Sequence, residues 1–162
     1  MPLVVVESHS MFHQGSPIKT LTAIPLLNQD RFDSWWQNNN EWYEENGIDY
    51  EQVGRWRFSS GLDKGDIILL YGSKNLKVGD IIVFNANSQA QRYPVIHRIV
   101  KINQENDITY ETKGDNNADQ IPFERNIHKQ DIIGKAILRI PKIGWIKLIF
   151  VEIIRFFFPN LI

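Results

Sequence analysis

The strongest constraint on the fold is a series of five short apolar segments between residues 65 and 140. In chain order they read GDIILLYG, GDIIVFNA, YPVIHRIVKI, DITYETKGDNN and DIIGKAILRI. Apolar, β-branched runs of this length, bounded by Gly, Asp and Asn, are typical of strands. Regular short strands with few helices between them predict a mainly β fold with an antiparallel, barrel-like sheet. The first two segments, each opened by Gly-Asp, are expected to pair as a hairpin.

Length and composition favour a single domain. The chain has 162 residues, 43% of them hydrophobic, which suffices for one buried core and is too little for a comfortable pair of domains. We expect one β domain over residues 1–142, carrying an aromatic-rich, partly helical insert at residues 16–60. Within the insert, DRFDSWWQNNNEWYEENGI spaces its aromatic residues as on a helix that ends near Gly47, a pattern more typical of a packing surface than of a ligand site. These aromatic residues are Phe32, Trp35, Trp36, Trp42 and Tyr43.

Residues 143–162 read IGWIKLIFVEIIRFFFPNLI and carry only Lys147, Glu152 and Arg155 as charges. A membrane-spanning helix needs about 20 apolar residues, and each charge near its centre costs roughly 2.5–3.5 kcal/mol, which disfavours a simple span. We expect a hydrophobic helix that ends before Pro159 and lies in the plane of a membrane interface. The alternative is a C-terminal helix packed on the domain core.

Charge and residue usage exclude several classes of function. With 18 basic and 19 acidic residues the net charge is -1, so a nucleic-acid partner is not expected. The chain has no cysteine, which removes thiol catalysis, disulfides and thiolate metal sites. Residues 1–6 lack the basic segment of a signal peptide, so no removable leader is expected. The four histidines lack metal-ligand spacing, so we expect no metal and no cofactor; they are His9, His13, His97 and His128.

A hydrolytic serine remains as the simplest chemistry, and three polar residues beside the strands could supply it. Ser10 follows the apolar start of the chain in VVVESHSM, His97 stands within PVIHRIV, and Asp115 lies in KGDNN. Each alone has a plainer interpretation, respectively a turn serine, a hydrogen-bonded core histidine and a turn aspartate. Together they meet the requirement of a hydroxyl for a base and of that base for an orienting carboxylate.

An ordered set of motifs resembles signal peptidase I of the archaeal and endoplasmic-reticulum type. The set is VVVESHSM, GDIIVF, YPVIHRIV, TKGDNN, DIIGKA and IPKIGWI, and it covers residues 2–15 and 62–150, leaving the insert outside. The serine before methionine in that family corresponds to Ser10. His97 matches the histidine of the family's His-Arg motif, which stands where the bacterial type has a catalytic lysine.

The resemblance implies roles for further residues. Asp119 is the nearest match to the family's catalytic acid, although it arrives early in this chain, and Asp115 is a second carboxylate or a substitute. The Ser10 backbone N–H and the Ser8 hydroxyl are expected to form the oxyanion hole. The chain departs from the family around the nucleophile, because His9 replaces a glycine and Phe12-His13 replaces Glu-Pro. A residue other than glycine at position 9 must avoid positive φ or accept strain.

The implied activity is that of a serine endopeptidase. By resemblance, residues 1–142 form its catalytic domain, which cleaves signal peptides from secretory preproteins after a small residue, without a cofactor. The expected location is a membrane, with the site on the extracytoplasmic face, and the expected partners are preprotein signal peptides, the lipid surface and accessory membrane subunits. Two alternatives stay open: a catalytically silent membrane-associated subunit or binding module of the same fold, and a self-cleaving regulator.

Overall fold

One continuous antiparallel sheet forms most of the protein. The structure is a computed structural model that describes residues 2–14, 25–86, 92–104 and 107–141. Within them the strand order is β1-β2-β7-β3-β4-β5-β6, and every neighbouring pair is antiparallel, which confirms the predicted fold class. The strands are β1 (Leu3–Val5), β2 (Ile67–Tyr71), β3 (Ile81–Phe84), β4 (Val95–Asn103), β5 (Thr109–Lys113), β6 (Ile127–His128) and β7 (Ile132–Ile140).

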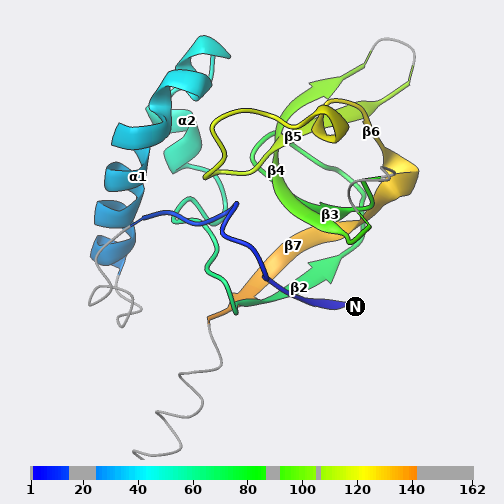
Figure 1. Cartoon of the computed structure of the whole chain (residues 1–162), viewed down its shortest axis with the longest axis horizontal. Helices are drawn as coiled ribbons and strands as arrows, with labels where there is room; N and C mark the ends of the chain where they lie inside the picture. The colour runs from blue at the N-terminus through cyan, green and yellow to red at the C-terminus, as the bar shows by residue number, and fades with distance from the viewer. Residues whose placement is uncertain (1, 15–24, 87–91, 105–106, 142–162) are drawn as a thin grey trace, which may run out of the picture.

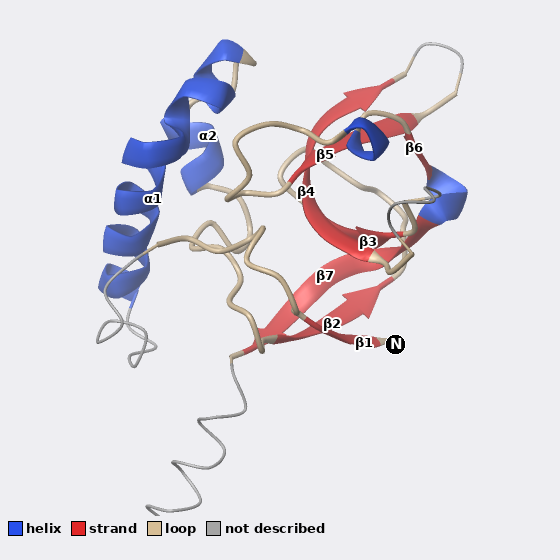
Figure 2. Ribbon diagram, viewed as in Figure 1, coloured by secondary structure: helices blue, strands red, loops and turns tan. Residues whose placement is uncertain are grey.

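The sheet curls into a half-barrel at one end. Figures 1 and 2 show strands β3 to β6 wrapping round, while β1, β2 and the far half of β7 extend away from them. The predicted hairpin between the first two segments is wrong, because β7 lies between β2 and β3 and pairs with both. Lys135 at the middle of this long strand is in register with Tyr71 on one side and Ile82 on the other.

The core lies on both sides of β3, whose four residues are all buried. Because side chains alternate along a strand, Ile81 and Val83 join one apolar cluster and Ile82 and Phe84 join another. The first cluster also contains Met11, which follows Ser10 directly. The nucleophile candidate therefore stands at the margin of the main core.

The aromatic insert packs as a separate helical layer beside the sheet (Figure 1). It contains α1 (Pro25–Glu45) and α2 (Tyr50–Gly54). The first helix ends as predicted near Gly47, which has a positive φ of 72° and donates its N–H to Glu44. The buried cluster of this layer comprises Phe32, Trp35, Trp36, Tyr43, Ile48, Val53 and, from β4, Val100.

The apolar C-terminal segment predicted at residues 143–162 lies outside the described residues, as do residues 16–24 of the insert. Across the helices of the described ranges, none is long and apolar enough to cross a membrane.

Candidate active site

Ser10 lies in a turn after β1 that is anchored on both sides. Before it, Val6 is 1% exposed and bonds through its N–H and C=O to the backbone that precedes β2. After it, Met11 is fully buried. The N–H of Phe12 donates to the carbonyl of His9 at 3.0 Å, which closes the turn. The turn thus presents a partly exposed serine from a fixed backbone.

His97 comes from the middle of β4, where both faces of the strand are buried. Its backbone is in register with Ile82 of β3, and only 4% of the residue is exposed. The ring atom Nε2 lies 2.9 Å from Oγ of Ser10. The structure therefore brings the predicted serine and histidine within hydrogen-bond distance.

The carboxylate on the other ring nitrogen belongs to Glu124. Its Oε1 lies 2.5 Å from Nδ1 of His97, and the side chain is fully buried. Glu124 ends the short 3-10 helix η2 (Pro122–Glu124). Its Oε2 accepts the N–H of Ile121 at 2.6 Å, and Thr112 contacts Oε1 at 3.4 Å. A serine, a histidine and a glutamate thus form one hydrogen-bonded series.

Sequence reasoning missed Glu124, because the resemblance directs attention to aspartates that closely follow the KGDNN motif. The available signal was the local sequence: the glutamate stands in IPFER, directly after Phe123 and two residues after a proline that can open a helical turn. A carboxylate in such a setting is buried only when it has partners.

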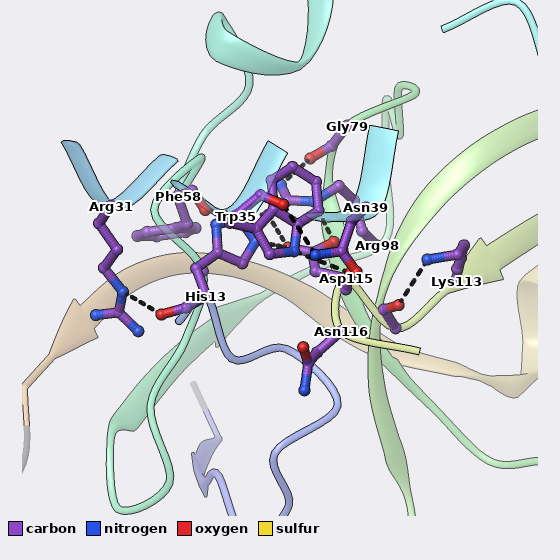
Figure 3. A network of polar contacts seen from close by, with 12 residues as sticks. His13, Arg31, Trp35, Asn39, Phe58, Gly79, Arg98, Lys113, Asp115 and Asn116 are labelled. Atoms are coloured by element: carbon purple, nitrogen blue, oxygen red, sulfur yellow. Dashed lines mark hydrogen bonds and ion pairs between the residues drawn. The ribbon is translucent and has the colours of Figure 1, made fainter. Parts of the chain in front are cut away.

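Asp115 holds a different place from the one expected beside His97 (Figure 3). It is fully buried and accepts from Arg98, which follows His97 on β4, through Nε at 2.8 Å and an NH2 group at 2.6 Å. Nε2 of His13 lies 3.0 Å from Oδ2, the oxygen that also accepts from the NH2 group of Arg98. Burial acts to raise the pKa of Asp115, but the charge of Arg98 and the bonds from His13 and Arg98 hold it well below its usual value.

Asp119 lies at the surface, where its carboxylate accepts from the Trp42 indole at 2.8 Å and from the N–H of Gln120 at 2.6 Å. Arg125 is 3.9 Å away. The backbone bond from Gln120 and the indole bond lower the pKa of Asp119. The contacts expected between His97 and either aspartate are not formed, and Glu124 stands in that position instead.

Ser8 lies beside Ser10, with its Oγ 3.0 Å from Oγ of Ser10. Within the described residues, the backbone N–H of Ser10 has no intramolecular acceptor. His9 keeps a negative φ, so the loss of glycine at that position introduces no left-handed strain. The two oxyanion donors implied by the resemblance, the Ser8 hydroxyl and the Ser10 N–H, both lie next to the Ser10 hydroxyl. The Ser8 side chain is exposed, and the Ser10 N–H is unpaired among the described residues.

The loop after β5 closes the site from the other side. The N–H of Asn116 donates to the carbonyl of Ser10 at 2.7 Å. A Cβ on Gly114 would lie 2.9 Å from Nε2 of His97 and 2.6 Å from the side-chain amide of Asn117. A side chain at position 114 would therefore require the Asn117 amide or the His97 ring to shift.

The donor set does not point to a metal. Among the described residues, no group of three or more His, Asp or Glu side chains could hold a metal ion. The arrangement is instead suited to nucleophilic attack by a hydroxyl, with an imidazole as base and a carboxylate to orient it.

Several known proteins are similar to this chain in sequence. No family model matches the chain. The chain is 28% identical over 95 residues to the signal peptidase complex catalytic subunit SEC11C of Homo sapiens, 31% over 101 residues to SEC11 of Scheffersomyces stipitis and 33% over 92 residues to SEC11 of Zygosaccharomyces rouxii. These alignments cover 53%, 57% and 51% of this chain and 48%, 60% and 54% of the relatives, so the chain spans about half the length of the curated relatives it matches. The similarity supports a relationship with signal peptidases of the endoplasmic-reticulum and archaeal type.

Proposed function

We propose that this chain is a serine endopeptidase of the signal peptidase type, which removes N-terminal signal peptides from secretory preproteins. The observation that carries the proposal is the hydrogen-bonded series from Ser10 through His97 to Glu124. The similarity to proteins named as catalytic subunits of a signal peptidase complex supports the same reaction.

In this mechanism the Ser10 hydroxyl attacks the scissile carbonyl, and Nε2 of His97 accepts its proton. The histidine then gives the proton to the leaving amine, and water hydrolyses the acyl-enzyme by the same route. Glu124 accepts the Nδ1–H bond throughout, which fixes the tautomer and stabilises the imidazolium that forms. The oxyanion is bound by the Ser8 hydroxyl and the N–H of Ser10.

The substrate binds as an added strand along β1. This strand is the last in the sheet and, among the described residues, pairs with β2 alone, so a further strand can add to its outer edge. Ser10 follows β1 closely, so an extended peptide on this edge leads toward the nucleophile. The residue before the cleaved bond is a small one in this proposal, as the resemblance to signal peptidases implies.

An exposed apolar face supports location at a membrane. Leu3, Leu69 and Leu138 are in register across β1, β2 and β7, and Leu3 and Leu138 are 62% and 50% exposed. In the next such row, Val5 and Ile140 are 51% and 40% exposed. This face, with the apolar segment 143–162 that follows β7, rests on the extracytoplasmic side of a bilayer. Accessory subunits fit the same proposal, since the relatives are named as parts of a complex.

The experiment is labelling with a fluorophosphonate probe together with cleavage of a preprotein. The full chain should be labelled and should cleave, and Ser10→Ala should lose both, with a rate loss on the order of 10⁴ or more. Ser34→Ala is the matched control, because that exposed hydroxyl only contacts the carbonyl of Asp30 within α1. An unlabelled, inactive wild-type chain that still binds a signal peptide would instead be a silent binding subunit.

A further inference from the structure

Two of the three residues at which the segment around Ser10 departs from the signal peptidase pattern, Phe12 and His13, are in contact with α1. The His13 ring stacks on Trp35 with centroids 4.0 Å apart and planes 2° apart. Arg31 lies over the Phe12 ring at 5.2 Å and donates from Nε to the carbonyl of His13 at 2.7 Å. The backbone that continues from Ser10 is therefore held by side chains of the insert.

The same helix also holds the loop that follows β5, as the position of Trp35 beside Asp115 shows (Figure 3). The indole N–H of Trp35 donates to the carbonyl of Asp115 at 3.1 Å. Lys113 is 1% exposed, with its Nζ over the rings of Trp42 and Tyr43 at 5.1 and 4.8 Å. Burial lowers the pKa of Lys113 to about 8. The loop between β5 and η2 is thus packed against the insert along several residues.

Asp115 links the segment that carries Ser10 to the strand that carries His97. One of its carboxylate oxygens meets His13 of the nucleophile segment, and both meet Arg98, the neighbour of His97. The next residue, Asn116, donates its N–H to the Ser10 carbonyl. A displacement of Asp115 would therefore move Ser10 and the loop beside His97 relative to each other.

We propose that the insert is an internal brace of the active site, in which Trp35 and His13, tied to Asp115, are positioning residues that hold Ser10 in contact with His97. This inference rests on the proposed peptidase function, and it assigns a role to the part of the chain that lies outside the resemblance to signal peptidases. The brace acts on geometry, since a displacement of about 1 Å at a reacting atom can cost on the order of a hundredfold in rate.

Trp36 provides a matched control for Trp35. It belongs to the same buried cluster and is 7% exposed, and its ring contacts in the described structure are with insert residues: Phe32, Trp35, Tyr43 and Tyr50. Trp35→Leu and Trp36→Leu should therefore lower the melting temperature to a similar degree, while only the first removes the stack on His13. Trp35→Phe keeps a ring for that stack and serves as the conservative variant.

The test measures kcat and KM for peptide cleavage well below the melting temperature of each variant. Trp35→Leu should lower kcat about tenfold or more at nearly unchanged KM, Trp35→Phe should restore most of it, and Trp36→Leu should stay within about twofold of wild type. Equal losses of kcat in the two leucine variants, or no loss in Trp35→Leu, would overturn the brace.

A second readout does not depend on activity. Hydrogen exchange of the Asn116 amide reports its bond to Ser10, and the Ile99 amide, which donates to Asp80 at 2.8 Å, serves as reference within the sheet. Relative to that reference, Asn116 should lose about tenfold of its protection in Trp35→Leu and little in Trp36→Leu. A chain that shows this difference but no Ser10-dependent cleavage would refute the proposed function and keep the brace; unchanged protection in Trp35→Leu would refute the brace.

Discussion

Oε1 of Glu124 lies 2.5 Å from Nδ1 of His97, while Nε2 of the same ring faces Ser10. The two residues come from different elements, since His97 is on β4 and Glu124 ends the 3-10 helix η2, which precedes β6. The hydrogen bond to Glu124 keeps the proton of the neutral ring on Nδ1. Nε2 then carries no proton and can act as the base.

Replacement of Glu124, the proposed triad acid, gives the most direct test of this assignment. Glu124→Gln should lower kcat by roughly 10²–10⁴, because an amide no longer stabilises the imidazolium and can bind the wrong tautomer. Asp119→Asn is the control, since it removes one negative charge at an exposed site. Its effect on kcat should stay within about threefold. A larger loss in Asp119→Asn than in Glu124→Gln would restore the aspartate assignment.

Gly114→Ala should inactivate the site by steric hindrance. The new methyl group would stand 2.9 Å from Nε2 of His97, where the Ser10 hydroxyl needs access. We expect loss of fluorophosphonate labelling with a folded domain, as judged by circular dichroism. Gly54→Ala is the matched control, because its Cβ would meet only Phe32 at an ordinary 3.4 Å. Normal labelling of the Gly114→Ala variant would show that the loop after β5 moves enough to accommodate the methyl group.

The stability of the fold should depend on pH through His13. Burial lowers the pKa of His13 from 6.5 to about 4, although its bond to Asp115 acts in the opposite direction. The unfolded chain therefore takes up a proton below pH 6.5 that the folded chain does not. The free energy of unfolding should fall as the pH drops from 6.5 to about 4, by roughly 3 kcal/mol from this group.

His13→Gln keeps a donor for Asp115 and cannot be protonated. Chemical denaturation at several pH values in this range should give a flatter profile for the variant than for wild type, because the other titrating groups are common to both. Parallel profiles would mean that His13 is protonated in the folded state.

Deletion of residues 145–162 tests the proposed membrane segment. The shortened chain should bind liposomes less and cleave membrane-inserted preprotein less, yet it should cleave a short soluble peptide at the wild-type rate. Thermal unfolding is the control measurement. Loss of a cooperative transition on deletion would show that the segment is part of the domain core.

Local sequence patterns predict much of this fold, because short strands and an aromatic helix follow from periodicity and turn residues. The pairing of β2 with β7 rather than β3 does not follow from them, since partner choice depends on where a distant strand docks. Similarly, Ser10 and His97 stand beside recognisable strands, whereas Glu124 reaches His97 only through the path of the loop that follows Lys113.

The burial of Asp115 is another feature that the local sequence does not predict. KGDNN reads as a turn, and a turn aspartate is ordinarily solvated. Here the insert and β4 enclose it, so the carboxylate becomes the buried partner of Arg98 and His13. That enclosure depends on the docking of a segment whose sequence alone predicts only a helix with an aromatic face.

Ser10, the proposed nucleophile, closely follows the short edge strand β1. β1 has three residues and, in the described part of the chain, pairs with β2 alone, so it can fray while the rest of the sheet stays folded. Fraying there would separate Ser10 from His97 without global unfolding, so activity should be lost at a lower temperature than structure. A peptide bound along the open edge would turn β1 into an interior strand, and substrate arrival and ordering of the nucleophile would then be a single event.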